Sequence, residues 1–243
     1  MIVLDYIAMS YKRILLKISG EQLAGQHGIG IDPEVATYFA NEIKAAIEGG
    51  TTVVVVAGAG NLVRGAQVAG NGIKRVTADH MGMLSGMINA LALTDIFEAS
   101  GLPTRCLSNI YADQVAESYS FRLAEKHLEK GRVVIIAGGI GRPYFTHDTA
   151  AVNLGLELSC DVVLKATKVD GVYDKDPNKF DDAVKFDSLT FQQAVENENI
   201  QVMDKAALGL AMEQNMPIIV CDTDTAGNLA KIARGETVGT KIS

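Results

Sequence analysis

The chain is poor in the features that mark secreted, zinc-binding and membrane proteins. Its three cysteines, Cys106, Cys160 and Cys221, are odd in number and far apart, so they fit neither a disulfide framework nor the spacing of zinc ligands. We interpret them as small buried hydrophobic residues in a reducing cytosol. No apolar stretch approaches the length of a membrane span, and residues 1–10 include Asp5 and no basic segment. We therefore expect neither a membrane anchor nor a signal peptide.

The chain also lacks an excess of basic residues. It has 22 Lys and Arg against 29 Asp and Glu, a formal net charge of −7, which argues against a general nucleic-acid or anionic-membrane binder. A local basic pocket for a small phosphate ligand is compatible with this charge. With 243 residues, 48% of them hydrophobic, the chain is long enough for one large α/β domain or two small ones. We expect a cytoplasmic protein.

Well-known catalytic and phosphate-binding motifs are absent as well. No Gly-Lys dipeptide occurs, so the chain has no Walker A loop. Gly58-Ala59-Gly60 would need a glycine at Val63 to complete the dinucleotide-binding fingerprint. The four histidines have no metal-ligand spacing, and neither a nucleophile elbow nor a direct metal-binding motif is present. These absences disfavour a Rossmann dehydrogenase, a P-loop kinase, a zinc hydrolase and a serine hydrolase.

What the chain does contain is three apolar runs that each end in a glycine-rich corner leading into a helix. We name them the first corner (Ser19-Gly20), the second corner (Gly58–Asn61) and the third corner (Gly138–Gly141). At the carboxyl edge of a parallel sheet, such corners expose backbone N–H groups and helix N-termini that bind phosphate oxygens. Lys17 and Arg64 place cations beside two of them. The pattern indicates a nucleotide site.

Strand and helix patterns alternate along the chain, which indicates a mostly parallel sheet with helices on both faces. The predicted strands are 14–19, 52–57, 104–107, 132–137, 161–166 and 217–221, with an edge strand in 235–243. The predicted helices are 33–48, 79–100, 121–130, 148–158, 190–197, 203–215 and 226–234, and 167–187 is expected to be a loop with a hairpin. We expect a tail over 1–10 and one domain over 11–243, in which a break near Lys168 separates an acceptor lobe (about 11–165) from a donor lobe (about 166–243).

Several polar residues in these segments have both a structural and a functional interpretation. Lys17, inside an apolar strand, either extends from a sheet edge or faces a ligand. Asp79 and Asp148 are each either a helix N-cap or a functional carboxylate, Asp79 for a ribose hydroxyl and Asp148 to orient Lys17. The polar segment 165–177 is either a solvated loop or a binding loop whose Tyr173 stacks on a base.

Taken in order, several segments closely resemble the bacterial uridylate kinases of the amino-acid kinase superfamily. They are 11–21, 60–65, 79–84, 165–177 and 202–204, and the resemblance runs from about Lys12 to the C-terminus. It implies an α/β fold, a three-layer αβα sandwich of the carbamate kinase-like type. It also implies an enzyme of pyrimidine nucleotide (CTP) biosynthesis that, with Mg²⁺, transfers the γ-phosphoryl group of ATP to UMP and so produces UDP and ADP.

The resemblance assigns site residues by position. The implied ATP contacts are Lys17, Ile18, Ser19, Gly20, Gly60, Arg64, Thr167, Tyr173 and Asp176. The implied UMP contacts are Ala59, Asp79, Ile140, Gly141, Arg142, Pro143, Tyr144, Phe145, Thr146 and His147. The segment where such enzymes sense GTP as an activator is Gly25, Gln26, His27, Gly28, Ile29 and Gly30. The family is typically hexameric and inhibited by UTP.

We expect direct in-line transfer without a covalent intermediate, in which the protein supplies positioning and charge. In this hypothesis Lys17 contacts the transferring phosphoryl group and Arg64 clamps a phosphate. Asp148 orients Lys17, and Asp204 assists the metal or the nucleotide.

The chain departs from the usual family pattern at the second and third corners. Ala59 stands where the family usually has glycine, and Ile140, Arg142 and His147 stand where it commonly has threonine, asparagine and threonine. Backbone contacts are an alternative means of uracil recognition at these positions, and His147 remains a candidate contact of the acceptor phosphate.

Two other functions are compatible with the same fold. A sister kinase that acts on an acyl amino acid or a carbamate would share the ATP half but lack segments 61–64 and 79–83. A molybdate or tungstate storage protein would keep the nucleotide loops without catalysis, and the intact set of Lys17, Asp148 and segment 165–177 argues against it.

Overall fold

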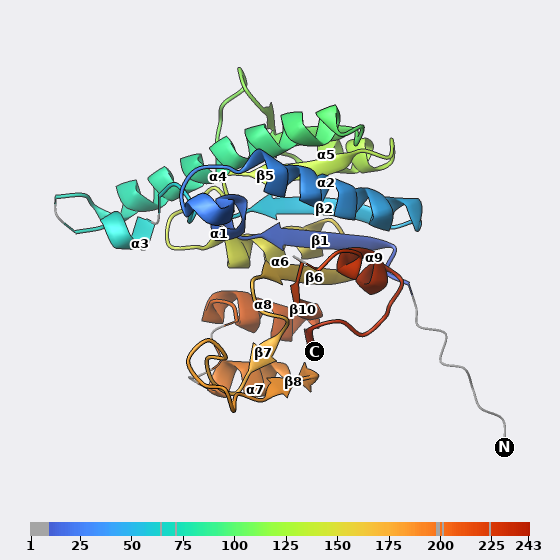
Figure 1. The fold of residues 1–243 in the computed structure, drawn as a ribbon. Coiled ribbons are helices and arrows are strands. Elements are labelled where there is room, and N and C mark those ends of the chain that lie inside the picture. The colour runs from blue at the N-terminus through green and yellow to red at the C-terminus, as the bar shows by residue number, and fades with distance from the viewer. Residues whose placement is uncertain (1–9, 64, 71, 198–199, 201, 224) are drawn as a thin grey trace.

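The computed structural model describes residues 10–63, 65–70, 72–197, 200, 202–223 and 225–243, so most of the predicted tail lies outside the described residues. The chain forms a sheet in the order β4-β3-β5-β2-β1-β6-β10-β11-β9 (Figure 1). Its strands are β1 Arg13–Ile18, β2 Thr52–Ala57, β3 Thr104–Ser108, β4 Glu117–Ser118, β5 Val133–Ala137, β6 Val162–Thr167, β9 Ser188–Leu189, β10 Ile218–Asp222 and β11 Thr240–Ile242. Every neighbouring pair is parallel except β10 with β11.

Helices cover both faces of this sheet, which confirms the three-layer α/β prediction. Their bounds are α1 Gly20–Leu23, α2 Pro33–Glu48, α3 Gly65–Val68, α4 Arg75–Ala99, α5 Phe121–Leu128, α6 His147–Glu157, α7 Phe191–Glu196, α8 Lys205–Gln214 and α9 Asn228–Ala233, with a 3₁₀ turn at Gly25–His27. One core lies under α2, α4 and α9, and the other lies under α5, α6, α7 and α8. In Figure 1, α7, α8 and the β7–β8 hairpin gather beside β10, and α3 projects from the body.

The two cores follow from the alternation of side chains along each strand. Leu16 of β1 is buried in the core under α2 and α4, whereas Leu15 is buried in the core under α6 and α8. Successive strand residues point to opposite faces. Lys17 therefore shares the face of Leu15, toward α6.

Two predicted helix starts and the predicted position of one strand in the sheet differ from the structure. The helix predicted to start at Asp79 begins one turn earlier, at Arg75. The sequence gave no signal for this start, because the N-cap residue Lys74 makes no side-chain cap bond and so belongs to no capping motif. The predicted 203–215 helix begins at Lys205 after Asp204 caps it. The strand expected at the sheet edge in 235–243 is internal, since β9 pairs with β11 on its outer side.

The 167–187 excursion contains the expected hairpin, formed by β7 (Val172–Tyr173) and β8 (Lys185–Phe186) in antiparallel pairing. The sheet is continuous across the predicted lobe break, because β6 pairs with β1 on one side and with β10 on the other. None of the described helices has the length and hydropathy needed to cross a membrane.

Candidate active site

Two lysines on neighbouring strands share one carboxylate at the centre of the sheet. Lys17 of β1 and Lys165 of β6 are direct partners in the strand register, so they lie side by side on the face toward α6. Asp148, in the first turn of α6, lies between them. Its Oδ1 is 2.9 Å from the Lys17 Nζ and its Oδ2 is 2.7 Å from the Lys165 Nζ. Lys165 also donates to the backbone carbonyl of Val202.

The charges within this cluster shift the pKa values of Asp148 and Lys165. Burial raises the pKa of Asp148, but the charges and hydrogen bonds of Lys17 and Lys165 lower it by more. The net result is a pKa of about 2. Burial lowers the pKa of Lys165, and Asp148 opposes that shift. Asp148 is therefore a carboxylate at neutral pH that orients two ammonium groups. Two cations and one anion leave the cluster attractive to phosphate.

The first and second corners are in direct contact. A Cβ on Gly20 would lie 2.5 Å from the Gly60 backbone N and 2.5 Å from the Asn61 Oδ1, so any side chain at position 20 would force the corners apart. Ser19 caps α1 by accepting from the Gln22 backbone N at 3.3 Å. The close approach brings the backbones of two glycine-rich loops together at the carboxyl edge beside Lys17.

A buried pair of amides holds the second corner on α4. Asn89 donates to the Gly58 carbonyl at 2.6 Å and to the Asn61 Oδ1 at 2.7 Å, and Asn61 donates back to the Asn89 Oδ1 at 2.9 Å. Asn61 also donates to the Gly30 carbonyl at 2.6 Å. These bonds connect the second corner, α4 and the segment at residues 25–30. The sequence motif contained Asn61 but gave no sign of Asn89.

Asp79 fastens the loop between the third corner and α6 to α4. The backbone N of Tyr144 donates to the Asp79 Oδ2 at 2.8 Å, and the Arg75 Nε donates to the Asp79 Oδ1 at 2.8 Å. Arg75 also lies over the Tyr144 ring, 5.3 Å from its centroid. Asp79 is thus not a helix cap but an anchor for the loop that precedes α6.

The N-terminus of α6 is fixed by Thr146 and Asp204. Thr146 caps α6 by accepting from the Asp148 backbone N at 3.0 Å, and its hydroxyl donates to the Asp204 Oδ2 at 2.5 Å. Thr149 donates to the Asp204 Oδ1 at 2.9 Å. Asp204 also caps α8 by accepting from the Ala207 backbone N at 2.9 Å. In this structure Asp204 joins α6 to α8, and its predicted catalytic role stays a prediction.

Comparison with known proteins agrees with this arrangement. A model of the amino acid kinase family matches residues 12–222. The chain belongs to the amino acid kinase family. A uridylate kinase of Sulfurovum sp. (strain NBC37-1) is 50% identical over 226 residues, 93% of this chain and 96% of that relative. A uridylate kinase of Dichelobacter nodosus (strain VCS1703A) is 48% identical over 232 residues, 96% of each.

Solved structures of the family have the same fold. The UMP kinase from Bacillus anthracis superposes with a TM-score of 0.91 at 38% identity, covering 96% of each chain. The UMP kinase from Ureaplasma parvum superposes with a TM-score of 0.88 at 32% identity, covering 97% of this chain and 100% of that one.

In this amino acid kinase, a cleft of about 890 Å³ runs along the three corners. The predicted site residues that line it are Lys17, Ser19, Gly20, Ala59, Gly60, Asp79, Phe145, Thr146, His147, Asp148, Thr167 and Asp204. Further lining residues that were not assigned as site residues include Glu21, Arg75, Met83, Lys165 and Lys168. A signal for Lys165 was available, since it lies near the carboxyl end of a buried strand as Lys17 does, but the strand register that pairs them is not visible in sequence.

Among the described residues, the other predicted ATP and UMP contacts do not line this cleft. Ile18 is buried in the core, and Ile140, Gly141, Arg142, Pro143 and Tyr144 belong to the part of the third-corner loop outside the lining. Tyr173 donates to the Asp170 Oδ1 at 2.5 Å in the β7–β8 excursion, and Asp176 is paired with Lys179 at 3.0 Å there. The prediction for Arg64 lies outside the described residues.

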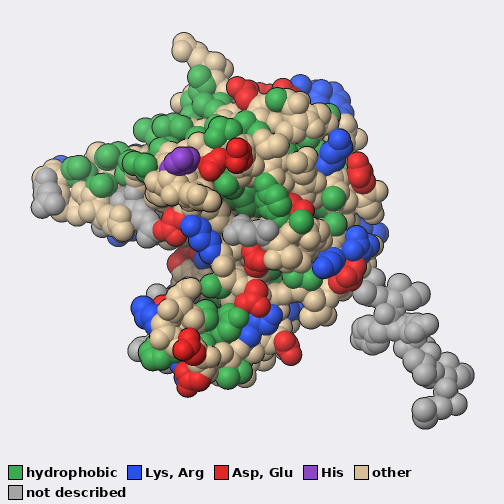
Figure 2. All heavy atoms as spheres, viewed as in Figure 1, with side chains coloured by type: hydrophobic (Ala, Val, Ile, Leu, Met, Phe, Trp, Pro, Cys, Tyr) green, Lys and Arg blue, Asp and Glu red, His purple; other side chains and the backbone are tan. Residues whose placement is uncertain are grey.

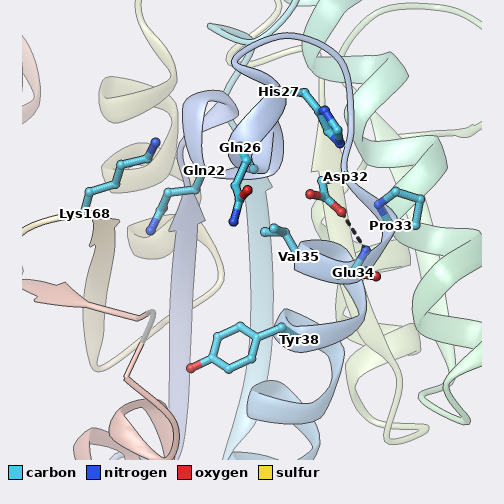
Figure 3. Close-up of a pocket in the computed structure, with 10 residues that line it drawn as sticks. Gln22, Gln26, His27, Asp32, Pro33, Glu34, Val35, Tyr38 and Lys168 are labelled. Carbon is cyan, nitrogen blue, oxygen red and sulfur yellow. Dashed lines mark hydrogen bonds between the residues drawn. The ribbon is translucent and has the colours of Figure 1, made fainter.

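A second cavity of about 950 Å³ lies next to the cleft (Figure 3). Figure 3 shows Gln22 and Gln26 directed into it from the chain around α1, Tyr38 from α2, and Lys168 from the loop after β6. Lys168 lines both cavities. Of the predicted effector segment, Gly25, Gln26 and His27 line the second cavity, whereas Ile29 is exposed.

Proposed function

We propose that this amino acid kinase is an enzyme that transfers the γ-phosphoryl group of ATP to UMP, producing UDP and ADP for pyrimidine nucleotide (CTP) synthesis. The observation that carries the proposal is the Lys17–Asp148–Lys165 cluster in a cleft built from three glycine corners. The curated relatives named uridylate kinase, about half identical over nearly the full length, support UMP as the acceptor. The same relatives disfavour a sister kinase of the family or a molybdate or tungstate storage protein.

Phosphoryl transfer needs positioned charge rather than a protein nucleophile. Lys17 and Lys165 supply positive charge where the transferring group passes, and Asp148 keeps both ammonium groups in place. The low pKa of Asp148 makes its carboxylate a weak proton acceptor, so it is poorly suited to act as a general base. The acceptor phosphate needs none, because a phosphate monoester with a second pKa of about 6 is already a dianion at neutral pH.

Each substrate takes one side of the cleft in this proposal. The first corner, Gly60 and Thr167 contact ATP, with Ile18, Arg64, Tyr173 and Asp176 as the remaining ATP contacts. Ala59, Asp79 and the loop 140–147 contact UMP. The acceptor lobe (about 11–165) and the donor lobe (about 166–243) then meet at β6, where Lys165 lies.

Mg²⁺ is the proposed cofactor, bound together with ATP. Among the described residues no group of three or more His, Cys, Asp or Glu side chains forms a metal site. The cleft carboxylates Asp148 and Asp204 are each already paired with neighbouring side chains. This donor set suits Mg²⁺, which keeps several water ligands and binds mainly through substrate phosphates. When bound, it neutralises charge on the transferring phosphoryl group.

Regulation and assembly complete the proposal. GTP activates through segment 25–30, whose Gly30 is hydrogen-bonded to Asn61 of the second corner, and UTP inhibits. A cytoplasmic homohexamer is the proposed assembly. Three exposed hydrophobic residues of α4 support this assembly, namely Val76, Leu84 and Ile88. Leu84 lies about two helical turns after Val76, and Ile88 one turn after Leu84, so the three share one face of the helix. Figure 2 shows hydrophobic side chains gathered over this part of the molecule.

The proposed function is tested by coupled measurement of ADP release with UMP, CMP, dTMP and acetylglutamate as acceptors, each with and without GTP. We expect the highest kcat/KM with UMP and a higher rate when GTP is present. A preference for acetylglutamate would indicate a sister kinase, and no ADP release with any acceptor would contradict the assignment.

A further inference from the structure

A glycine in the middle of α4 lies against a histidine of the cleft. A Cβ on Gly86 would be 2.7 Å from the His147 Nε2, closer than a Cβ tolerates, and 3.5 Å from the His147 Cε1. The next neighbour, the Ala57 carbonyl, would be at 3.4 Å, an ordinary contact. The imidazole of His147 is therefore what leaves no room for a side chain at position 86.

Nothing in the backbone of α4 requires glycine at this position. Gly86 lies inside a 25-residue helix and is absent from the glycines with positive φ. Glycine in a helix interior costs about 1 kcal/mol relative to alanine. Helices nevertheless contain glycine at positions where another group approaches the backbone closely, despite this loss of stability. Here the approaching group is the side chain of His147, the first residue of α6.

His147 is held in the cleft as a neutral ring. Its Nε2 is buried and has no hydrogen-bond partner among the described residues. Burial, and then the charge of Lys17, lower its pKa to about 4, with Asp148 opposing. The ring lies beside Gly139 of the third corner and lines the cleft near Asp79 and Met83, on the α4 side.

We propose that Gly86 and His147 form a size-complementary pair, in which the missing side chain of Gly86 positions the imidazole as a wall of the acceptor subsite. This inference rests on the proposed function, because it assigns the α4 side of the cleft to UMP. Gly86 touches no substrate and is a positioning residue that acts through His147. A methyl group at position 86 pushes the ring toward the space that the acceptor occupies, while the ATP side, formed by the first corner and Thr167, stays unchanged.

The pair is tested by a double-mutant cycle of Gly86→Ala, His147→Thr and the combined variant. We expect Gly86→Ala alone to raise the KM for UMP about tenfold, as a misplaced positioning group does, with the KM for ATP changed less than about twofold. In the combined variant the methyl group has room, so its KM for UMP should equal that of His147→Thr alone. Gly209→Ala on α8 is the matched control, since a Cβ there has no neighbour within 4 Å.

Thermal unfolding gives a second readout that needs no activity. Gly86→Ala should lower the Tm of the wild-type protein but raise the Tm of His147→Thr, where only the helix propensity of alanine remains. If Gly86→Ala fails to fold, its folding in the His147→Thr background still supports the pair. Failure in both backgrounds, or effects on KM and Tm that simply add, would overturn it. Wild-type protein that does not phosphorylate UMP would refute the proposed function instead, leaving the Tm cycle interpretable.

Discussion

At the scale of single residues, the site depends on one carboxylate. Lys17 and Lys165 are both largely buried, and the cost of burying two like charges side by side is offset by Asp148, which contacts each of them. The sequence was enough to predict that Asp148 orients Lys17. It was not enough to predict the second lysine, because the pairing of Lys17 with Lys165 is a property of the strand register.

The buried imidazole of His147 predicts that the free energy of unfolding falls at acid pH. Its pKa is about 4 in the folded protein against 6.5 for the free side chain. Between these values the unfolded chain binds the proton and the native protein does not, so stability falls as the pH drops from 6.5 to 4. A difference of this size corresponds to a stability loss on the order of 3 kcal/mol. About 2 kcal/mol of that loss falls between pH 7.5 and pH 5, and replacing His147 by Thr should remove it, as measured by urea unfolding at these two pH values.

His80→Gln is the control for this measurement, since His80 is an exposed histidine of α4. It should leave the difference in unfolding free energy between the two pH values unchanged. If His147→Thr also leaves that difference unchanged, the neutral buried imidazole is not the acid-sensitive group.

At the scale of elements, the sequence predicted which segments are strands and helices better than it predicted their ends and contacts. The start of α4 was misplaced because Lys74 offers no side-chain cap, and Asp79, a plausible cap by residue type, instead anchors Tyr144. The resemblance assigned the loop 140–147 to the acceptor. In the structure Gly139 and residues 145–148 line the cleft, whereas residues 140–144 are not part of its lining.

The attachment of the second corner to α4 leads to a stability prediction. Asn89 is fully buried, and its amide bonds both Gly58 and Asn61. Asn89→Ala leaves these groups without their partner inside the protein, and each buried unsatisfied group costs about 1–3 kcal/mol. Urea unfolding should show a loss of at least this size.

Thr94→Ala is the comparison on the same helix, since the Thr94 side chain is only partly buried and its hydroxyl donates to the Ala90 carbonyl one turn earlier. Its loss of unfolding free energy should be clearly smaller. Equal losses for the two variants would mean that the amide pair does not hold the corner.

At the scale of the whole molecule, the strand order explains why three distant segments form one cleft. The strands that end in the first and second corners are neighbours, β1 and β2, and the third corner follows β5 on the other side of β2. The sequence predicted a mostly parallel sheet with its glycine corners at one edge. The order of the strands was not predictable, because it depends on which buried faces pack together rather than on any local pattern.

The assembly proposal predicts the effect of charge on the exposed face of α4. Leu84 and Ile88 are 48% and 53% exposed in the single chain. Leu84→Glu and Ile88→Glu place a charge where a subunit contact would exclude water, so sedimentation velocity should show a hexamer for the wild type and smaller species for both variants. Met212→Glu, on an exposed apolar residue of α8, should leave the hexamer intact. Unchanged sedimentation of the α4 variants would place the contact elsewhere.

Direct transfer from ATP to UMP beside Lys17 can be followed with a labelled γ-phosphate. With [γ-³²P]ATP, UMP and Mg²⁺, we expect label in UDP and none bound to the protein. Lys17→Ala should lower kcat on the order of 10²-fold or more, as for a lost electrostatic stabiliser. Lys12→Ala, at an exposed position one residue before β1, should keep the wild-type rate. Label on the protein, no label in UDP, or a near-normal kcat for Lys17→Ala would rule out direct transfer beside Lys17.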